Sequence, residues 1–325
     1  MISLFRTLNL INLLLLGIIA VVLRLGILLN PPQSLDFSIF ESYASVLFNL
    51  PTENLFAVET NLYLALILSV VQAIIFNRIV NEYNLLGKQS FLPALMYVTC
   101  SSLLVHFLVL TPVLLCNFLV IWMLDKFLSI HRKESAQGTM FDLGMIIGVG
   151  ALIYLPFISM MLLLWICLII FRPFNWREWI AGLIGLATVY FFIAVAYYWT
   201  DSFEELKNFK VPLAIEFKLF NIDIYNYLVL IPLVVILFLS VISIQQKLYR
   251  SYVHIRKAFL MLFFIFIFSL LSFFITSKYQ VYHFLLAVPA ASVFMAFYFM
   301  SSNKRWFYES LYLILVGCII YFQFA

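Results

Sequence analysis

Long apolar runs separated by short polar segments fill almost the whole chain of 325 residues. A helix needs about 20 mainly apolar residues to cross a bilayer. The pattern therefore predicts an all-α fold, a polytopic transmembrane helix bundle with about 11 spans. The expected spans are roughly Leu8–Leu29, Asn61–Phe76, Phe91–Leu108, Pro112–Leu128, Phe141–Leu155, Pro156–Phe171, Ile180–Trp199, Tyr227–Ile244, Ala258–Ile275, Phe284–Met300 and Leu311–Phe324.

Two of these divisions are inferred from proline. The run Phe91–Leu128 is too long for one crossing, and it has a natural break at Thr111 and Pro112. Proline lacks a backbone donor and disfavours helix at the residue before it. The next long run is divided at Pro156 for the same reason.

The composition agrees with a membrane protein, because 65% of the residues are hydrophobic and only 10% are charged. Soluble globular chains carry about a quarter charged residues. The first apolar run has no small-residue cleavage site before Arg24, so we expect a retained helix and not a removed signal peptide. Without a linker or a clear internal repeat, one membrane domain over residues 1–325 is the simplest account.

The positions of the basic residues predict the orientation, because cytoplasmic loops are enriched in Lys and Arg. With a cytoplasmic N-terminus, most of the 19 basic residues fall on the inner side. They are Arg6, Arg78, Lys88, Lys126, Arg132, Lys133, Arg172, Arg177, Lys247, Arg250, Arg256, Lys257, Lys304 and Arg305. The chain is therefore expected to cross the bacterial inner membrane many times, with its C-terminus outside.

The first outer loop, residues 30–60, is acidic and contains no Lys or Arg. Apolar residues at helical spacing between Ser38 and Leu50 predict a short amphipathic helix at the membrane surface. Asp36 and Glu41 are the candidate catalytic residues of this loop, each as a general base. The alternative is structural, since Asp36 could help to cap the helix and Ser38 with Glu41 has the form of a capping box.

Residues 200–226 form the fourth outer loop and predict a second interfacial helix. Ser202 and Glu205 again have the spacing of a capping box, so the acidic residues here are expected at a helix start. Lys207 and Lys210 either contact lipid phosphate or belong to a solvated face.

Five further residues are candidates for binding a phosphate or a sugar. Arg24 is a single charge inside an apolar helix, where it either snorkels to the interface or binds an anion. Lys278, Tyr279, Tyr282 and His283 lie together at the outer mouth of a late span that contains a proline, and all four can hydrogen-bond such a ligand.

We expect no metal and no cofactor. The four cysteines lie in apolar runs without CxxC spacing, and the four histidines fall on different sides or depths of the membrane. The chain also lacks an outer DxD pair, a P-loop and a GxSxG motif. The sequence suggests no nucleic-acid partner.

The order of these features resembles the GT-C class of polytopic glycosyltransferases, which use a polyprenyl-phosphate sugar as donor at the outer membrane face. In that class a first helix leads to an outer loop with the catalytic carboxylate, and this chain has LDFSIFESYASVL there. The late segment KYQVYHFLLAVPAA is similar to a basic, tyrosine and proline run of the class. The first loop is shorter than in the class, lacks its adjacent acidic pair, and no soluble outer domain follows.

This resemblance implies a polyprenyl-phosphate-linked sugar as partner, besides membrane lipids, and a metal-independent, inverting transfer. Asp36 or Glu41 would deprotonate the acceptor hydroxyl, while Arg24, Lys278 and His283 would hold the phosphate. The stretch IIFRPFNWREWIAGLIG also resembles an inner-membrane family of Bacteroidota with no settled activity. Two alternatives stay open. One is a non-catalytic subunit of a secretion or motility machine with membrane protein partners, and the other is a lipid or small-solute transporter.

Overall fold

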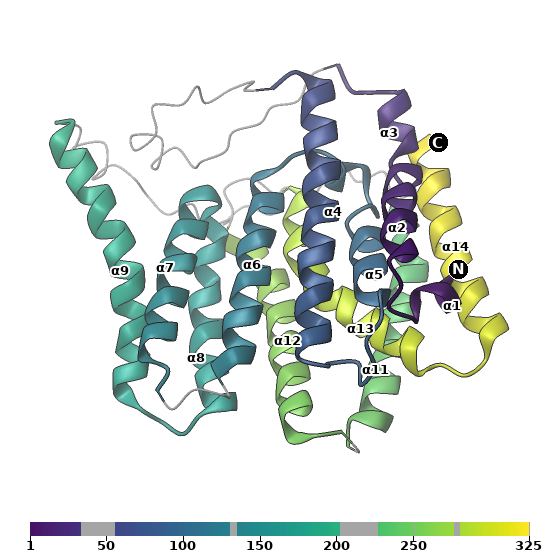
Figure 1. Ribbon diagram of the computed structural model, residues 1–325. Helices are drawn as coiled ribbons and strands as arrows, with labels where there is room; N and C mark the ends of the chain where they lie inside the picture. The colour runs from purple at the N-terminus through teal and green to yellow at the C-terminus, as the bar shows by residue number, and fades with distance from the viewer. Residues whose placement is uncertain (34–55, 131–134, 202–226, 250, 276–279, 325) are drawn as a thin grey trace.

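The computed structural model describes residues 1–33, 56–130, 135–201, 227–249, 251–275 and 280–324. Every regular element in these ranges is a helix (Figure 1). Seven helical segments are long and apolar enough to cross a membrane, and three shorter apolar segments accompany them. The chain is thus a multi-pass, all-helical membrane protein, as its composition predicts.

The seven long segments are α4 (Val58–Glu82), α6 (Pro112–Ser129), α9 (Trp176–Trp199), α11 (Leu230–Leu248), α12 with the 3₁₀ turn η6 (Val253–Leu271 and Ser272–Ile275), the 3₁₀ segment η7 with α13 (Val281–Ala287 and Val288–Ser301), and α14 (Arg305–Phe324). The shorter segments are α2 (Ile11–Val22), α7 (Gln137–Ile153) and the turn η4 with α8 (Leu155–Ser159 and Met160–Phe171). The remaining elements are α1 (Ile2–Phe5), α3 (Leu25–Leu29), α5 (Leu92–Cys100) and the turn η2 (Val105–Phe107).

The two divisions inferred from proline are confirmed. Pro112 is the first residue of α6, and the hydroxyl of Thr111 caps that helix by accepting from the amide of Leu114 at 3.2 Å. Tyr154 adopts an extended backbone between α7 and the turn that contains Pro156.

The predicted span Phe91–Leu108 is wrong as a continuous helix. The helix α5 has only nine residues, or about 14 Å at 1.5 Å per residue, and the chain continues irregularly to Thr111. All nine residues of α5 are buried inside the protein. Irregular backbone is tolerated at membrane depth where protein surrounds it, which explains why a half-length helix is stable here.

The late span around Pro289 also departs from a regular helix. Its first seven residues form the 3₁₀ segment η7, and α13 begins only at Val288. Because proline has no N–H, Pro289 cannot donate to the carbonyl of Leu285. That carbonyl accepts from the backbone amide of Val288 and from the Asn117 side chain, the latter at 3.0 Å.

The helices α5 and α13 pack against each other in the centre, and other helices cover both. The described helix ends on either side of the connections α4–α5, α6–α7, α8–α9 and α11–α12 lie at one end of the bundle, the lower end in Figure 1, which we call the basic end. Basic residues near these connections are Arg78, Lys88, Lys126, Arg172, Arg177, Lys247, Arg256 and Lys257. This grouping is what the predicted orientation requires of a cytoplasmic end.

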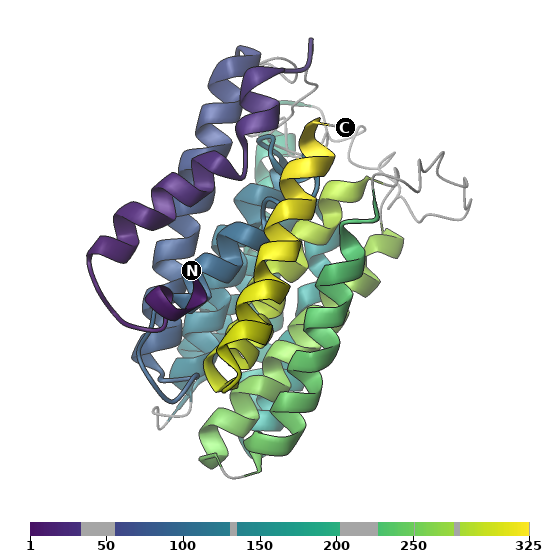
Figure 2. The same ribbon diagram turned by 90° about the vertical axis from the view of Figure 1, so that its right-hand side faces the viewer.

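The opposite end, which we call the far end, holds α3, the start of α4 and the end of α14 (Figure 1). Figure 2 shows α14 running along one side of the bundle between α2 and α11. It contacts α1, α3 and α11. The amphipathic helices predicted within residues 30–60 and 200–226 fall mainly on residues 34–55 and 202–226, which lie outside the described residues.

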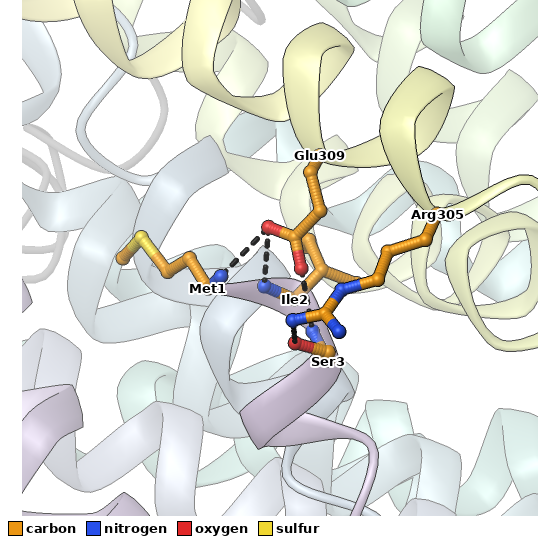
Figure 3. A network of polar contacts seen from close by, with 5 residues as sticks. All are labelled: Met1, Ile2, Ser3, Arg305 and Glu309. Atoms are coloured by element: carbon orange, nitrogen blue, oxygen red, sulfur yellow. Dashed lines mark hydrogen bonds and ion pairs between the residues drawn. The ribbon is translucent and has the colours of Figure 1, made fainter.

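The carboxylate of Glu309 on α14 holds the N-terminal turn of the chain (Figure 3). It accepts from the amino group of Met1 at 2.7 Å and from the amides of Ile2 and Ser3 at 3.1 and 3.0 Å. A negative charge at the start of a helix is favourable, because the first amides have no partner within the helix. The contact ties α1 to α14.

Glu309→Gln is expected to lower the stability of the purified protein by about 1 to 2 kcal/mol, because bonds to a charged acceptor are lost at a largely enclosed site. Thermal unfolding in detergent measures the effect. The control is Glu82→Gln, the same change at an exposed residue of α4. Equal midpoints for the two variants would show that Glu309 does not anchor α1.

Candidate functional site

The first apolar run is broken where Arg24 stands. The helix α2 ends at Val22, and α3 begins at Leu25. Arg24 has a non-helical backbone between them. The break interrupts the regular helical bonding and directs the arginine side chain into the bundle, where it is 1% exposed. A snorkelling position for Arg24 is therefore wrong.

Two groups from distant parts of the chain contact the guanidinium of Arg24. One terminal nitrogen donates to the hydroxyl of Ser69 on α4 at 2.9 Å. The other donates to the carbonyl of Leu108 at 3.3 Å. That carbonyl lies four residues before Pro112, which has no N–H to offer it. The broken first span and the irregular segment before α6 thus meet at this side chain.

The positive charge of Arg24 is not balanced in the described part of the chain. The three ion pairs found there join Met1 with Glu309, Lys126 with Asp142, and Arg172 with Glu178. The Nε–H of Arg24 also finds no acceptor among the described residues. A buried charge without an opposite charge is strongly unfavourable, so this guanidinium favours an anion as an additional ligand.

Several buried polar side chains of the bundle differ from Arg24 because they carry no charge, and they hydrogen-bond other groups of the bundle. Tyr97 donates to the Gln72 carbonyl oxygen at 2.9 Å, and the Gln72 amide donates to the carbonyl of Leu114 at 2.6 Å. Thr99 and Tyr312 share a bond of 3.0 Å. These neutral groups join α4, α5, α6 and α14. Their burial is tolerated because each of them has a hydrogen-bond partner.

His283 lies inside the bundle and not at the predicted outer rim, with no exposed surface. Its Nε2 lies 2.9 Å from the carbonyl of Ser269 and 3.1 Å from the hydroxyl of Ser272. Since a carbonyl only accepts, the Nε2 nitrogen carries the proton. The hydroxyl of Tyr154 then donates to Nδ1 at 2.7 Å. His283 therefore joins η7 to α12 and to the end of α7.

Tyr154→Phe is expected to destabilise the protein by about 1 to 2 kcal/mol, because it leaves the buried Nδ1 of His283 without a donor. The midpoint of thermal unfolding in detergent measures the loss. Tyr198→Phe is the matched control, since Tyr198 is 77% exposed. A midpoint for Tyr154→Phe equal to that of the control would contradict a fold-stabilising role for this bond.

The structure brings two predicted candidate segments, the one with Arg24 and the one with Tyr282 and His283, to the same turn, η2. The turn η2 contacts η7, which carries Tyr282 and His283, and Leu108 directly after η2 contacts Arg24. Tyr282 is partly buried, and its ring lies 6.5 Å from that of Tyr154. Both segments belong to the half of the bundle away from the basic end. The predicted site residues Asp36, Glu41, Lys207, Lys210, Lys278 and Tyr279 lie outside the described residues.

Within the described ranges, no group of three or more His, Cys, Asp or Glu side chains could hold a metal ion.

A family of unknown function, DUF6427, matches residues 9–325. The chain belongs to the DUF6427 family. The match covers every helix from α2 to α14, so it includes the broken first span with Arg24 and the whole bundle behind it. No curated protein and no solved structure matches the chain.

Three residues that support the candidate site were not singled out from the sequence. Ser69 and Tyr154 are ordinary residues of apolar runs, and only the folded bundle shows that they contact Arg24 and His283. Gln323 lies 300 residues from Leu23, to which it donates a hydrogen bond. Gln323 could have been noticed in the sequence because it is a polar residue inside an apolar run, where its carboxamide needs a hydrogen-bond partner.

Proposed function

We propose that the chain is a GT-C-like membrane glycosyltransferase that takes a sugar from a polyprenyl-phosphate donor at the outer face of the inner membrane. The observation that supports this proposal is Arg24, a buried guanidinium without a carboxylate partner in the described part of the chain. A lipid-linked phosphate can bring a negative charge to this depth, because its polyprenyl chain is soluble in the bilayer. The forked donors of arginine suit phosphate oxygens.

In the proposed reaction, Asp36 or Glu41 removes the proton from an acceptor hydroxyl. The acceptor oxygen attacks the anomeric carbon of the sugar, and the bond from that carbon to the phosphate oxygen breaks. The leaving polyprenyl phosphate takes up the electron pair and gains negative charge. Arg24 neutralises this charge, which is greater in the transition state than in the donor, so the interaction assists the reaction.

The proposal assigns the phosphate to Arg24 and not to His283. Both ring nitrogens of His283 have partners within the bundle, at Tyr154 and at Ser269. In this account His283 supports the backbone of η7 behind the site. Lys278, Tyr279, Lys207 and Lys210 remain candidate contacts to the donor from the outer loops, and Tyr282 remains one from η7.

The test is transfer from polyprenyl-phosphate sugars by the purified protein, with Asp36→Asn and Glu41→Gln beside the wild type. General-base catalysis contributes about 100- to 10,000-fold, so one of these variants is expected to lose activity by that factor while binding donor normally. Glu59→Gln, an exposed change at the start of α4, is the control. Equal activity in all variants would remove both carboxylates from the mechanism.

A second candidate function is transport of the same class of lipid phosphate or of a small anion. It is favoured by the two interrupted segments, α5 and η7 with α13, which pack together in the centre of the bundle. Discontinuous helices near the bilayer midplane form substrate sites in many transporters. Reconstituted liposomes distinguish the two functions: protein-dependent translocation without sugar transfer would favour the transporter.

A further inference from the structure

The side chain of Gln323 near the end of α14 bridges the break in the first span. Its amide nitrogen donates to the carbonyl of Leu23, and its carbonyl oxygen accepts from the amide of Gly26 at 3.2 Å. In an unbroken helix, these two backbone groups would bond to the amide of Ile27 and the carbonyl of Val22. One carboxamide therefore gives a partner to two of the backbone groups that lose their helical bonds at the break.

Gly26 permits this contact because it has no side chain. A Cβ atom at Gly26 would lie 2.6 Å from Cβ of Gln323 and 2.8 Å from its backbone oxygen. The other glycine of this span, Gly17, has nothing within 4 Å of such an atom. The close approach of α3 to α14 is thus specific to the position next to the break.

We propose that Gln323, with Gly26, is a positioning residue that holds the first span broken and thereby directs the guanidinium of Arg24 into the bundle, toward Ser69 and Leu108. This role deepens the proposed function, on which its importance for donor binding rests. A buried backbone group without a partner is unfavourable, so without the carboxamide the groups of Leu23 and Gly26 regain partners by continuing the helix. Continuation changes the backbone of Arg24 and turns its side chain away from Ser69 and Leu108.

The test is the accessibility of Arg24 to phenylglyoxal, which reacts with exposed guanidinium groups, measured by mass spectrometry on the purified full chain in detergent. Arg24 is 1% exposed in the wild type, so it is expected to be protected. In Gln323→Leu and Gly26→Val, its labelling is expected to rise about tenfold, because the loss of a buried hydrogen-bond partner shifts an equilibrium by roughly that factor. Gly17→Val is the control and is expected to stay protected.

Labelling of the exposed Arg177 serves as the internal reference in every sample. If Gln323→Leu does not fold, Gln323→Asn, whose amide is too short to reach both groups, replaces it with the same expectation. An Arg24 that stays as protected in a folded Gln323 variant as in the wild type overturns the positioning role.

Binding of a C55 polyprenyl phosphate to the same samples separates this inference from the proposed function. If the wild type binds the lipid and the variants with labelled Arg24 bind it about tenfold more weakly, both stand. If the wild type binds none while the labelling changes as expected, the proposed function fails and the role of Gln323 in positioning Arg24 remains.

Discussion

Arg24→Gln is expected to weaken binding of a polyprenyl phosphate by about 100-fold, because hydrogen bonds to charged groups contribute about 1.5 to 3 kcal/mol each. The same change is expected to leave the ligand-free protein as stable as the wild type or more stable. A guanidinium that is buried without an opposite charge destabilises the protein that carries it, so its removal relieves that cost. Titration by native mass spectrometry and thermal unfolding measure the two effects.

The control for Arg24→Gln is Arg177→Gln, the same change at an exposed arginine near the basic end. It is expected to change neither lipid binding nor stability measurably. If Arg24→Gln lowers the unfolding midpoint strongly and leaves lipid binding intact, Arg24 has a structural role, and the anion-binding account of the site is wrong.

Gly144→Val is expected to destabilise the protein by about 3 kcal/mol, the upper end for overpacking a tight interface. A Cβ atom at Gly144 on α7 would collide with the carbonyl oxygen of Gly182 on α9, which is backbone and cannot turn away. Gly185 on α9 faces the backbone of Phe141 in the same way. Small residues permit such an approach between helices in membranes.

Gly138→Val is the matched control, because Gly138 lies on the same helix and has nothing within 4 Å of an added Cβ atom. The unfolding midpoint and the yield of monodisperse protein measure both variants. The helix α9 lies at the edge of the bundle, where α7 is its main neighbour (Figure 1). A Gly144→Val protein as stable as Gly138→Val would show that α7 and α9 are not so closely packed.

The sequence predicts the helical class and the two proline divisions because both depend on local properties. Apolar runs of sufficient length and the missing N–H of Pro112 and Pro156 act whatever the rest of the chain does. The half-length helix α5 could not be predicted in this way. The protein buries α5 completely and most of its irregular continuation, and burial of that kind depends on the assembled bundle.

The sequence likewise predicts only part of the candidate site. A charged residue inside an apolar helix is rare, so Arg24 could be singled out from the sequence. Its partners could not, since Ser69, Leu108 and Gln323 come from three other segments and contact Arg24 or its break only after folding. His283 was misplaced because the sequence does not show that α7 and α12 supply its partners.

The most direct test of the account is a cryo-EM structure of the protein in lipid nanodiscs with a C55 polyprenyl phosphate. The account predicts phosphate density within hydrogen-bond distance of the Arg24 guanidinium, including its Nε–H, which has no acceptor among the described residues. A structure in which a carboxylate of the chain itself occupies those donors, with the lipid phosphate elsewhere, would contradict it.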